Sequence, residues 1–165
     1  MSLNTTVKLS LQATLRKSLD LTTAQDPLNF TQTVTLTSGT GADQADQSWH
    51  DRRTLASAAS EELDVSGALA DAFGDTLALA RVKALYVKNL SDDDTLLIGG
   101  AAAGALGLFS DTTDRFQLRP GGIFLFTAPD AVGIPVGSND KLKLEHSGDT
   151  TTSLDYEIVI IGASA

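Results

Sequence analysis

The sequence has 165 residues, 42% of them hydrophobic, and a formal net charge of −9 at pH 7, which fits one globular domain able to bury a core of its own. Acidic residues outnumber basic ones 21 to 12. This ratio argues against a nucleic-acid partner, because phosphate contacts need clustered Lys and Arg. The absence of cysteine excludes disulfides, thiolate catalysis and thiolate metal ligands.

The N-terminal segment has polar residues throughout its apolar positions and no small-residue cleavage motif, so we expect no secretory signal peptide and synthesis in a host cytoplasm. The longest run of low polarity lies between Leu96 and Phe109. Its length of about 14 residues is below the roughly 20 that a helix needs to cross a bilayer. We therefore expect no membrane partner.

Residues 1–37 show the period-two alternation of extended chain. In TTVKLSLQATL the apolar side chains fall on one face and polar side chains on the other, and NFTQTVTLT repeats the pattern. We expect an extended N-terminal β arm here, because such a segment can add strands to the exposed edge of a neighbour. The candidate partner-binding residues of the arm are Val7, Leu9, Leu11, Phe30, Val34 and Leu36.

Residues 38–48 are rich in Gly, Ser, Asp and Gln and nearly lack apolar side chains. Such a composition does not supply a packed core, so we expect a flexible linker that separates the arm from a body at residues 49–165.

The body shows short β-type runs separated by Gly, Asp, Asn and Pro, which predicts an antiparallel sandwich of jelly-roll type. The run IFLF is expected to fill the core. It is preceded by Pro120 and Gly121 and followed by Pro129. One short helix or 3₁₀ turn is expected over Ser66–Gly74, opened by a serine and closed by a glycine. The expected strands are Arg53–Val65, Thr76–Asn89, Thr95–Gly99, Arg115–Arg119, Gly122–Ala128, Lys141–Glu145 and Ser153–Ile161.

The segment DTLALARVKALYVKNL fits both a strand and a helical face, and periodicity alone does not separate the two. We favour a strand because Asp75 and Asn89 bracket the segment and its neighbours are strands.

A search for chemistry finds no catalytic, cofactor or metal motif. The histidines His50 and His146 lack metal-ligand spacing, and WHDRR places His50 beside an acid on extended chain, where neighbours point to opposite faces. The nucleophile-elbow and phosphate-loop patterns are missing. Asp92, Asp93 and Asp94 are expected to form a solvated turn, with a bound hard cation as the open alternative.

Four segments carry a resemblance to a known family. They are QSWHDRRTLASAASEELDVSGALADAFGDTLALARVKALYVKNLS, LLIGGAAAGALGLF, LRPGGIFLFTAPDAVGIPV and LDYEIVIIGAS, and together they resemble small structural proteins of tailed-bacteriophage virions. The resemblance implies a non-enzymatic capsid decoration (cement) protein. It further implies a homotrimer with a jelly-roll body, located on the capsid surface and bound to the major capsid protein.

Three other functions stay open. A head- or tail-fibre tip that binds host glycan would have a similar body, although carbohydrate sites usually present exposed aromatic side chains. A small β-sandwich hydrolase or lyase would use acids such as Glu145 and Asp155, which nothing in the sequence pairs. An ordinary cellular interaction domain is the third alternative.

Overall fold

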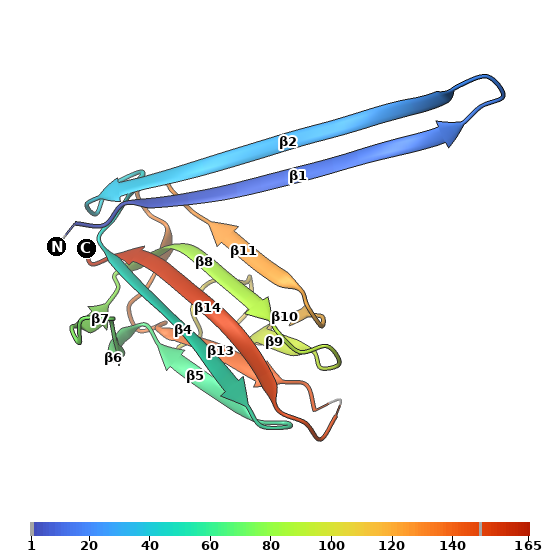
Figure 1. Cartoon of the computed structure of the whole chain (residues 1–165). Coiled ribbons are helices and arrows are strands. Elements are labelled where there is room, and N and C mark those ends of the chain that lie inside the picture. Colours follow the sequence, from blue (N-terminus) through green and yellow to red (C-terminus); the bar gives the residue numbers. More distant parts are fainter. Residues whose placement is uncertain (1, 149) are drawn as a thin grey trace.

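The computed structural model describes residues 2–148 and 150–165, and all of their regular structure is β. The prediction of an all-β fold is confirmed. The strands of these residues form a long hairpin, two larger antiparallel sheets and one small hairpin (Figure 1).

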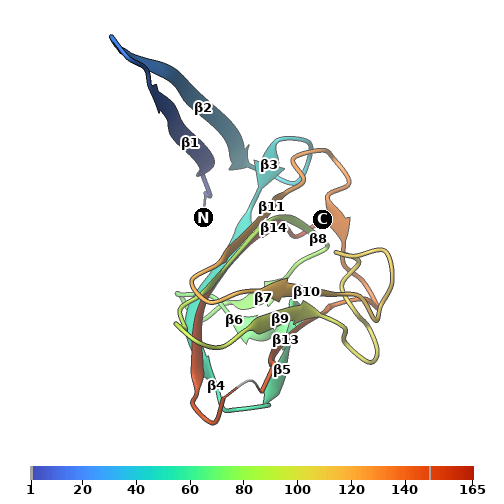
Figure 2. The ribbon, with the colours of Figure 1, turned by 90° about the vertical axis from the view of Figure 1, so that its right-hand side faces the viewer.

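The long hairpin consists of β1 (Thr5–Ser18) and β2 (Thr23–Ser38), which pair antiparallel from Thr5↔Leu36 to Ser18↔Thr23. The short β3 (Gln44–Ala45) runs parallel to the end of β2. At roughly 3.3 Å per residue, β1 is about 46 Å long. Figures 1 and 2 show that most of this length projects away from the rest of the chain.

The body consists of two antiparallel sheets that lie as two layers (Figure 2). The first has the order β10 (Arg115–Leu118), β9 (Leu96–Gly99), β13 (Lys141–His146), β5 (Ser60–Asp64). The second has the order β11 (Ile123–Thr127), β8 (Arg81–Asn89), β14 (Leu154–Ala163), β4 (Gln47–Leu55), and β12 (Ile134–Pro135) also pairs with β8. The small hairpin is formed by β6 (Ser66–Ala70) and β7 (Thr76–Ala78).

One largely aliphatic core lies between these sheets. Alternate residues of β8 and β14, such as Leu85 and Ile158, point inward from one sheet and meet Ile98 and Leu144 of the other. The buried aromatic Tyr156 donates its hydroxyl hydrogen to Glu61 Oε1 at 2.7 Å, and Glu61 Oε2 lies 2.6 Å from an Arg53 guanidinium nitrogen. This pairing satisfies the polar end of the large ring where it reaches the sandwich margin.

The helical turn expected over Ser66–Gly74 is wrong. Ser66–Ala70 is β6, which pairs with β7, and the chain reverses over the next five residues. The Asp71 carboxylate accepts the backbone N–H groups of Phe73 and Asp75 at 2.8 and 2.9 Å, and Gly74 has φ +88°. These features stabilise a tight turn, so strand pairing outweighs the local helix signals.

The single strand expected over Arg53–Val65 is two strands in opposite sheets. β4 ends at Leu55 and β5 begins at Ser60, and the turn between them places Ala58 at φ +57°. This turn consists of three alanines and one serine without Gly, Pro, Asn or Asp, so the composition signal for a turn is weak. By contrast, the segment that fitted both helix and strand is confirmed as β, divided into β7 and β8.

The expectation that residues 38–48 do not pack is also wrong. They contain β3 and the first residues of β4, and Ala45 is fully buried. The backbone N–H of Asp43 donates to Pro129 O at 2.7 Å, and Arg81 Nη1 donates to Thr40 O at 3.2 Å. Backbone hydrogen bonds therefore hold this stretch against the body without help from large apolar side chains.

The Tyr156–Glu61 contact can be tested by replacing Tyr156 with Phe, which removes one hydrogen bond to a charged acceptor and leaves the ring in the core. We expect a loss of about 1.5 kcal/mol in the free energy of unfolding, measured by urea denaturation. Tyr86→Phe, on the outer face of the same sheet, is the matched control and is expected to change stability by less than about 0.5 kcal/mol. Equal stability of the wild type and Tyr156→Phe would contradict the assignment.

Candidate binding surface

The strand register of the long hairpin brings the two predicted apolar stripes onto one face. Val7 lies opposite Val34 and Leu11 lies opposite Phe30, and residues directly opposite in an antiparallel pair share a face. The other face is polar, with pairs such as Ser10↔Thr31. The hairpin is therefore a ribbon with one polar face and one mostly apolar face, on which Gln32 lies opposite Leu9 and Asp26 lies opposite Leu15.

This apolar face extends further toward the hairpin tip than the residues predicted from the sequence. Leu15 and Leu28 continue it toward the tip, and Leu19 and Leu21 lie in the connecting turn. Leu15 is 74% exposed and Leu21 is 99% exposed. The signal for Leu15 was present, because its position continues the odd-numbered alternation of Leu9 and Leu11.

The root of the hairpin is packed against the body. Leu36 is fully buried in a small cluster with Ala84 and Ile161, and Val7 and Val34 pack partly against the same cluster. Leu36 was predicted to bind a partner, but its side chain is buried within the protein and is not available for such a contact. Leu9, Leu11 and Phe30 remain between 44% and 48% exposed.

Hydrogen bonds to one loop of the body hold the same root. The buried Lys83 donates its Nζ hydrogen to Asp130 O, close to the Pro129 carbonyl that accepts from Asp43. Burial lowers the pKa of the Lys83 ammonium, and the nearby Asp130 carboxylate acts in the opposite direction. The Asp43 bond thus joins the hairpin root to this loop, and the Lys83 bond joins the loop to β8.

An apolar groove lies between the hairpin root and the outer face of the β11-β8-β14-β4 sheet. It encloses about 390 Å³ and is lined by consecutive residues Thr5–Leu9 of β1 and, across from them, by Tyr86, Leu125 and Val159 among others.

The expectation that IFLF fills the core is wrong for half of the run. Phe124 packs on the core, whereas Ile123 and Leu125 point outward, and Ile123 is 58% exposed.

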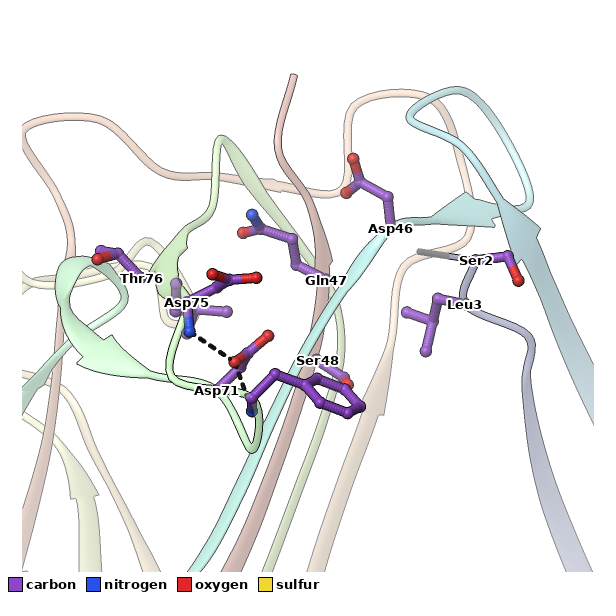
Figure 3. Close-up of a pocket in the computed structure, with 10 residues that line it drawn as sticks. Ser2, Leu3, Asp46, Gln47, Ser48, Asp71, Asp75 and Thr76 are labelled. Atoms are coloured by element: carbon purple, nitrogen blue, oxygen red, sulfur yellow. Dashed lines mark hydrogen bonds between the residues drawn. The ribbon is translucent and has the colours of Figure 1, made fainter.

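A second, smaller pocket lies beside the hairpin root and is drawn in Figure 3. It encloses about 170 Å³, which is below the roughly 300 Å³ of small-ligand sites. Its Asp71 carboxylate is occupied by two backbone N–H groups of the β6–β7 turn, and Asp46 accepts hydrogen bonds from Ser164. These acids therefore stabilise the local fold.

The two histidines lie in different environments. His50 is exposed on β4, and its neighbour Asp51 pairs with Arg53 at 3.0 Å. His146 is buried, with its Nε2 3.4 Å from Asp94 Oδ2 and its Nδ1 accepting the N–H of Gly148 at 2.9 Å. Because Nδ1 accepts a hydrogen bond, Nε2 is the ring nitrogen that carries a proton.

The three aspartates expected in a solvated turn behave differently from one another. Asp92 and Asp93 are exposed, but Asp94 is fully buried, and its Oδ2 accepts hydroxyl hydrogens from Thr150 and Thr152 at 3.0 Å each. Desolvation works to raise the Asp94 pKa. The two hydroxyls and the adjacent His146 outweigh it and hold the pKa below its ordinary value. The solvated-turn prediction is therefore wrong for Asp94.

The two acids named for a possible hydrolase lie in different sheets and are each engaged by bases. Glu145 pairs with Lys143 at 2.7 Å, and the hydrogen bond from Lys143 lowers its pKa. Asp155 accepts from the Thr54 hydroxyl at 2.6 Å and from Arg52 at 2.8 Å, and these contacts lower its pKa. Neither carboxyl has the raised pKa of a general acid.

Within the described ranges, no group of three or more His, Cys, Asp or Glu side chains is arranged to hold a metal ion, and no helix could span a membrane. Comparison with protein-family models, with curated proteins and with solved structures gave no significant match. The hairpin face and the groove at its root are therefore the surfaces from which a function is inferred.

The contribution of Asp94 can be tested by replacing it with Ala, which leaves the Thr150 and Thr152 hydroxyls without their acceptor. We expect the melting temperature at pH 7 to fall by several degrees, while Asp93→Ala in the same loop has little effect. Since folding lowers the Asp94 pKa, its contribution is present above the unfolded value of about 3.9 and is lost as the pH falls. The difference between wild type and Asp94→Ala should therefore narrow below about pH 4, whereas a constant difference would contradict the lowered pKa.

Proposed function

We propose that this protein is a non-enzymatic virion structural protein of a tailed phage, a capsid decoration protein that holds the major capsid protein through its β1–β2 hairpin. The observation that carries the proposal is the exposed apolar face of this hairpin, which includes Leu9, Leu11, Leu15, Leu28 and Phe30. Only the root of this face is covered by the body.

The physical state of the hairpin supports a binding role. An isolated two-stranded ribbon is marginally stable in water, and a contiguous exposed apolar surface is typical of an interaction site. A partner that covers the apolar face would supply the second layer that the ribbon lacks. The virion and capsid assignments themselves rest on the family resemblance.

The body supports the jelly-roll form of the proposal. Its eight main strands form two four-stranded sheets, and successive strands lie in opposite sheets at every step except β9 to β10. The body is also strongly acidic, with nineteen acids and nine bases in residues 39–165, which favours solubility at high copy number. The homotrimer and its place on the capsid surface rest on the family resemblance.

Binding can be tested by co-sedimentation with undecorated capsids. Leu9→Asp with Leu11→Asp places two charges on the apolar face, and we expect the affinity to fall by about a hundredfold or more, since each buried leucine contributes roughly 1.5 to 3 kcal/mol. The matched control, Asn29→Asp with Thr31→Asp, adds the same charge to the polar face on β2 and should bind nearly as well as the wild type. Circular dichroism reports whether both variants keep the β fold, and unchanged binding of the leucine variant would reject the hairpin contact.

The homotrimer can be tested independently by multi-angle light scattering of the purified protein. We expect a mass of three 17.2 kDa subunits at micromolar concentration, because a trimer would bury further apolar area of the body. A single-subunit mass across this concentration range would reject the trimer without bearing on the hairpin contact.

A further inference from the structure

The outer edge of β1 is open for strand pairing. In the described part of the chain β1 pairs with β2 alone, so it is an edge strand of the hairpin sheet. The Leu19 N–H donates to Thr22 O at 2.8 Å across the turn. Leu19 and Thr22 are therefore a hydrogen-bonded pair that continues the register of β1 and β2. Because hydrogen-bonded and non-hydrogen-bonded pairs alternate in an antiparallel ladder, every odd residue of β1 bonds to β2. The even residues, such as Lys8 and Ser10, direct their N–H and C=O groups outward.

A hydrogen bond at the opposite end of the hairpin shows which residues of β2 direct their main-chain groups away from β1. The Thr37 N–H of β2 donates to Asp43 O, on the side away from β1, so the odd residues of β2 point outward. Pro27 occupies one of these outward positions and has no N–H. The β2 edge is thus interrupted by a proline and covered at its end by β3, whereas β1 contains neither Pro nor Gly along its 14 residues.

The groove at the root shows what the open edge faces. Its hairpin wall is the run of consecutive residues Thr5–Leu9, which includes residues of both faces of β1. The strand therefore presents its edge, rather than only its apolar face, to the groove. Across it, Leu125 and Tyr86 provide an apolar surface on which side chains of an added strand would pack.

The positive charge of β1 favours an acidic strand as its pairing partner. All three bases of the hairpin, Lys8, Arg16 and Lys17, lie on β1, and β1 has no acid. Two copies of β1 pairing with each other would bring six positive charges together, which disfavours self-pairing. An acidic strand would instead place carboxylates beside Lys8 and Arg16.

We propose that the outer edge of β1 binds an extended strand of the partner protein that alternates acidic and apolar side chains. The main-chain groups of even residues such as Lys8, Ser10 and Gln12 pair with this strand, and its apolar side chains extend the apolar face of the hairpin into the groove. This inference rests on the proposed function only in assigning the strand to the protein that the hairpin holds.

The test uses the full-length protein and a synthetic peptide in which Thr and Val alternate with Glu. A peptide with Lys in place of each Glu is its control. Hydrogen exchange followed by NMR reports each amide separately. With the acidic peptide we expect the amides of Lys8, Ser10 and Gln12 to exchange at least about tenfold more slowly, while the odd-residue amides, already bonded to β2, change little.

Two proline variants separate edge pairing from adsorption to the apolar face. Ser10→Pro removes one outward N–H of β1 and should abolish binding of the peptide while the β1–β2 pairing remains. Asn29→Pro removes an outward N–H of β2 and should leave binding intact. Both positions lie on the polar face, so the apolar face is unchanged.

Protection of the even β1 amides by the acidic peptide, lost in Ser10→Pro and kept in Asn29→Pro, supports the proposal. Absence of protection, equal protection by the Lys peptide, or protection that arises without peptide as the protein concentration rises would overturn it, the last by making a second copy the occupant. Because no capsid is used, failure here leaves the capsid-binding proposal standing, and failure of co-sedimentation leaves the edge proposal standing.

Discussion

The buried side chain of Leu36 sets the direction of the long hairpin relative to the body. It packs with Ala84 and Ile161 on the outer face of the β11-β8-β14-β4 sheet, and the adjacent Thr37 bonds to Asp43, which in turn bonds to Pro129. A two-stranded ribbon has no core of its own, so its orientation is fixed where it joins a larger sheet. The exposed apolar face, the groove and the open edge of β1 all follow from this single attachment.

Charge is distributed unevenly about the same attachment. The hairpin between Thr5 and Ser38 has three bases and two acids, while nearly all the remaining acids of the chain lie in the body. Many of the body carboxylates are paired locally, as Asp64 is with Lys141 at 2.6 Å. An acidic surface repels other acidic surfaces at a distance, so the hairpin is the part of the molecule that an acidic partner approaches most readily.

The sequence predicted those features that depend on period-two alternation within one segment. The apolar face of β1 and the strand assignment of β8 are examples, because side-chain parity alone determines which residues share a face. It did not predict that Leu36 is internal, since that depends on contact with β8 and β14, far away in sequence. Asp94 was missed for the same reason: its burial and its Thr150 and Thr152 partners come from a loop more than fifty residues later. The turn at Ala58 was missed because residues 56–59 contain three alanines and a single serine, which is a weak turn signal.

The two surfaces of the hairpin differ in what they can contribute to recognition. Burial of the apolar face is non-directional and tolerates many partners, so it contributes affinity with little selection. Pairing along the β1 edge is directional, because each outward N–H and C=O needs a matching group at strand spacing, and Lys8 and Arg16 add a preference for sign of charge. Pro27 lacks an N–H on the outer edge of β2, so strand pairing is favoured on the β1 edge of the ribbon. A partner that engages both surfaces is therefore restricted to one edge and one face, which fixes its orientation on the hairpin without any contact from the body core.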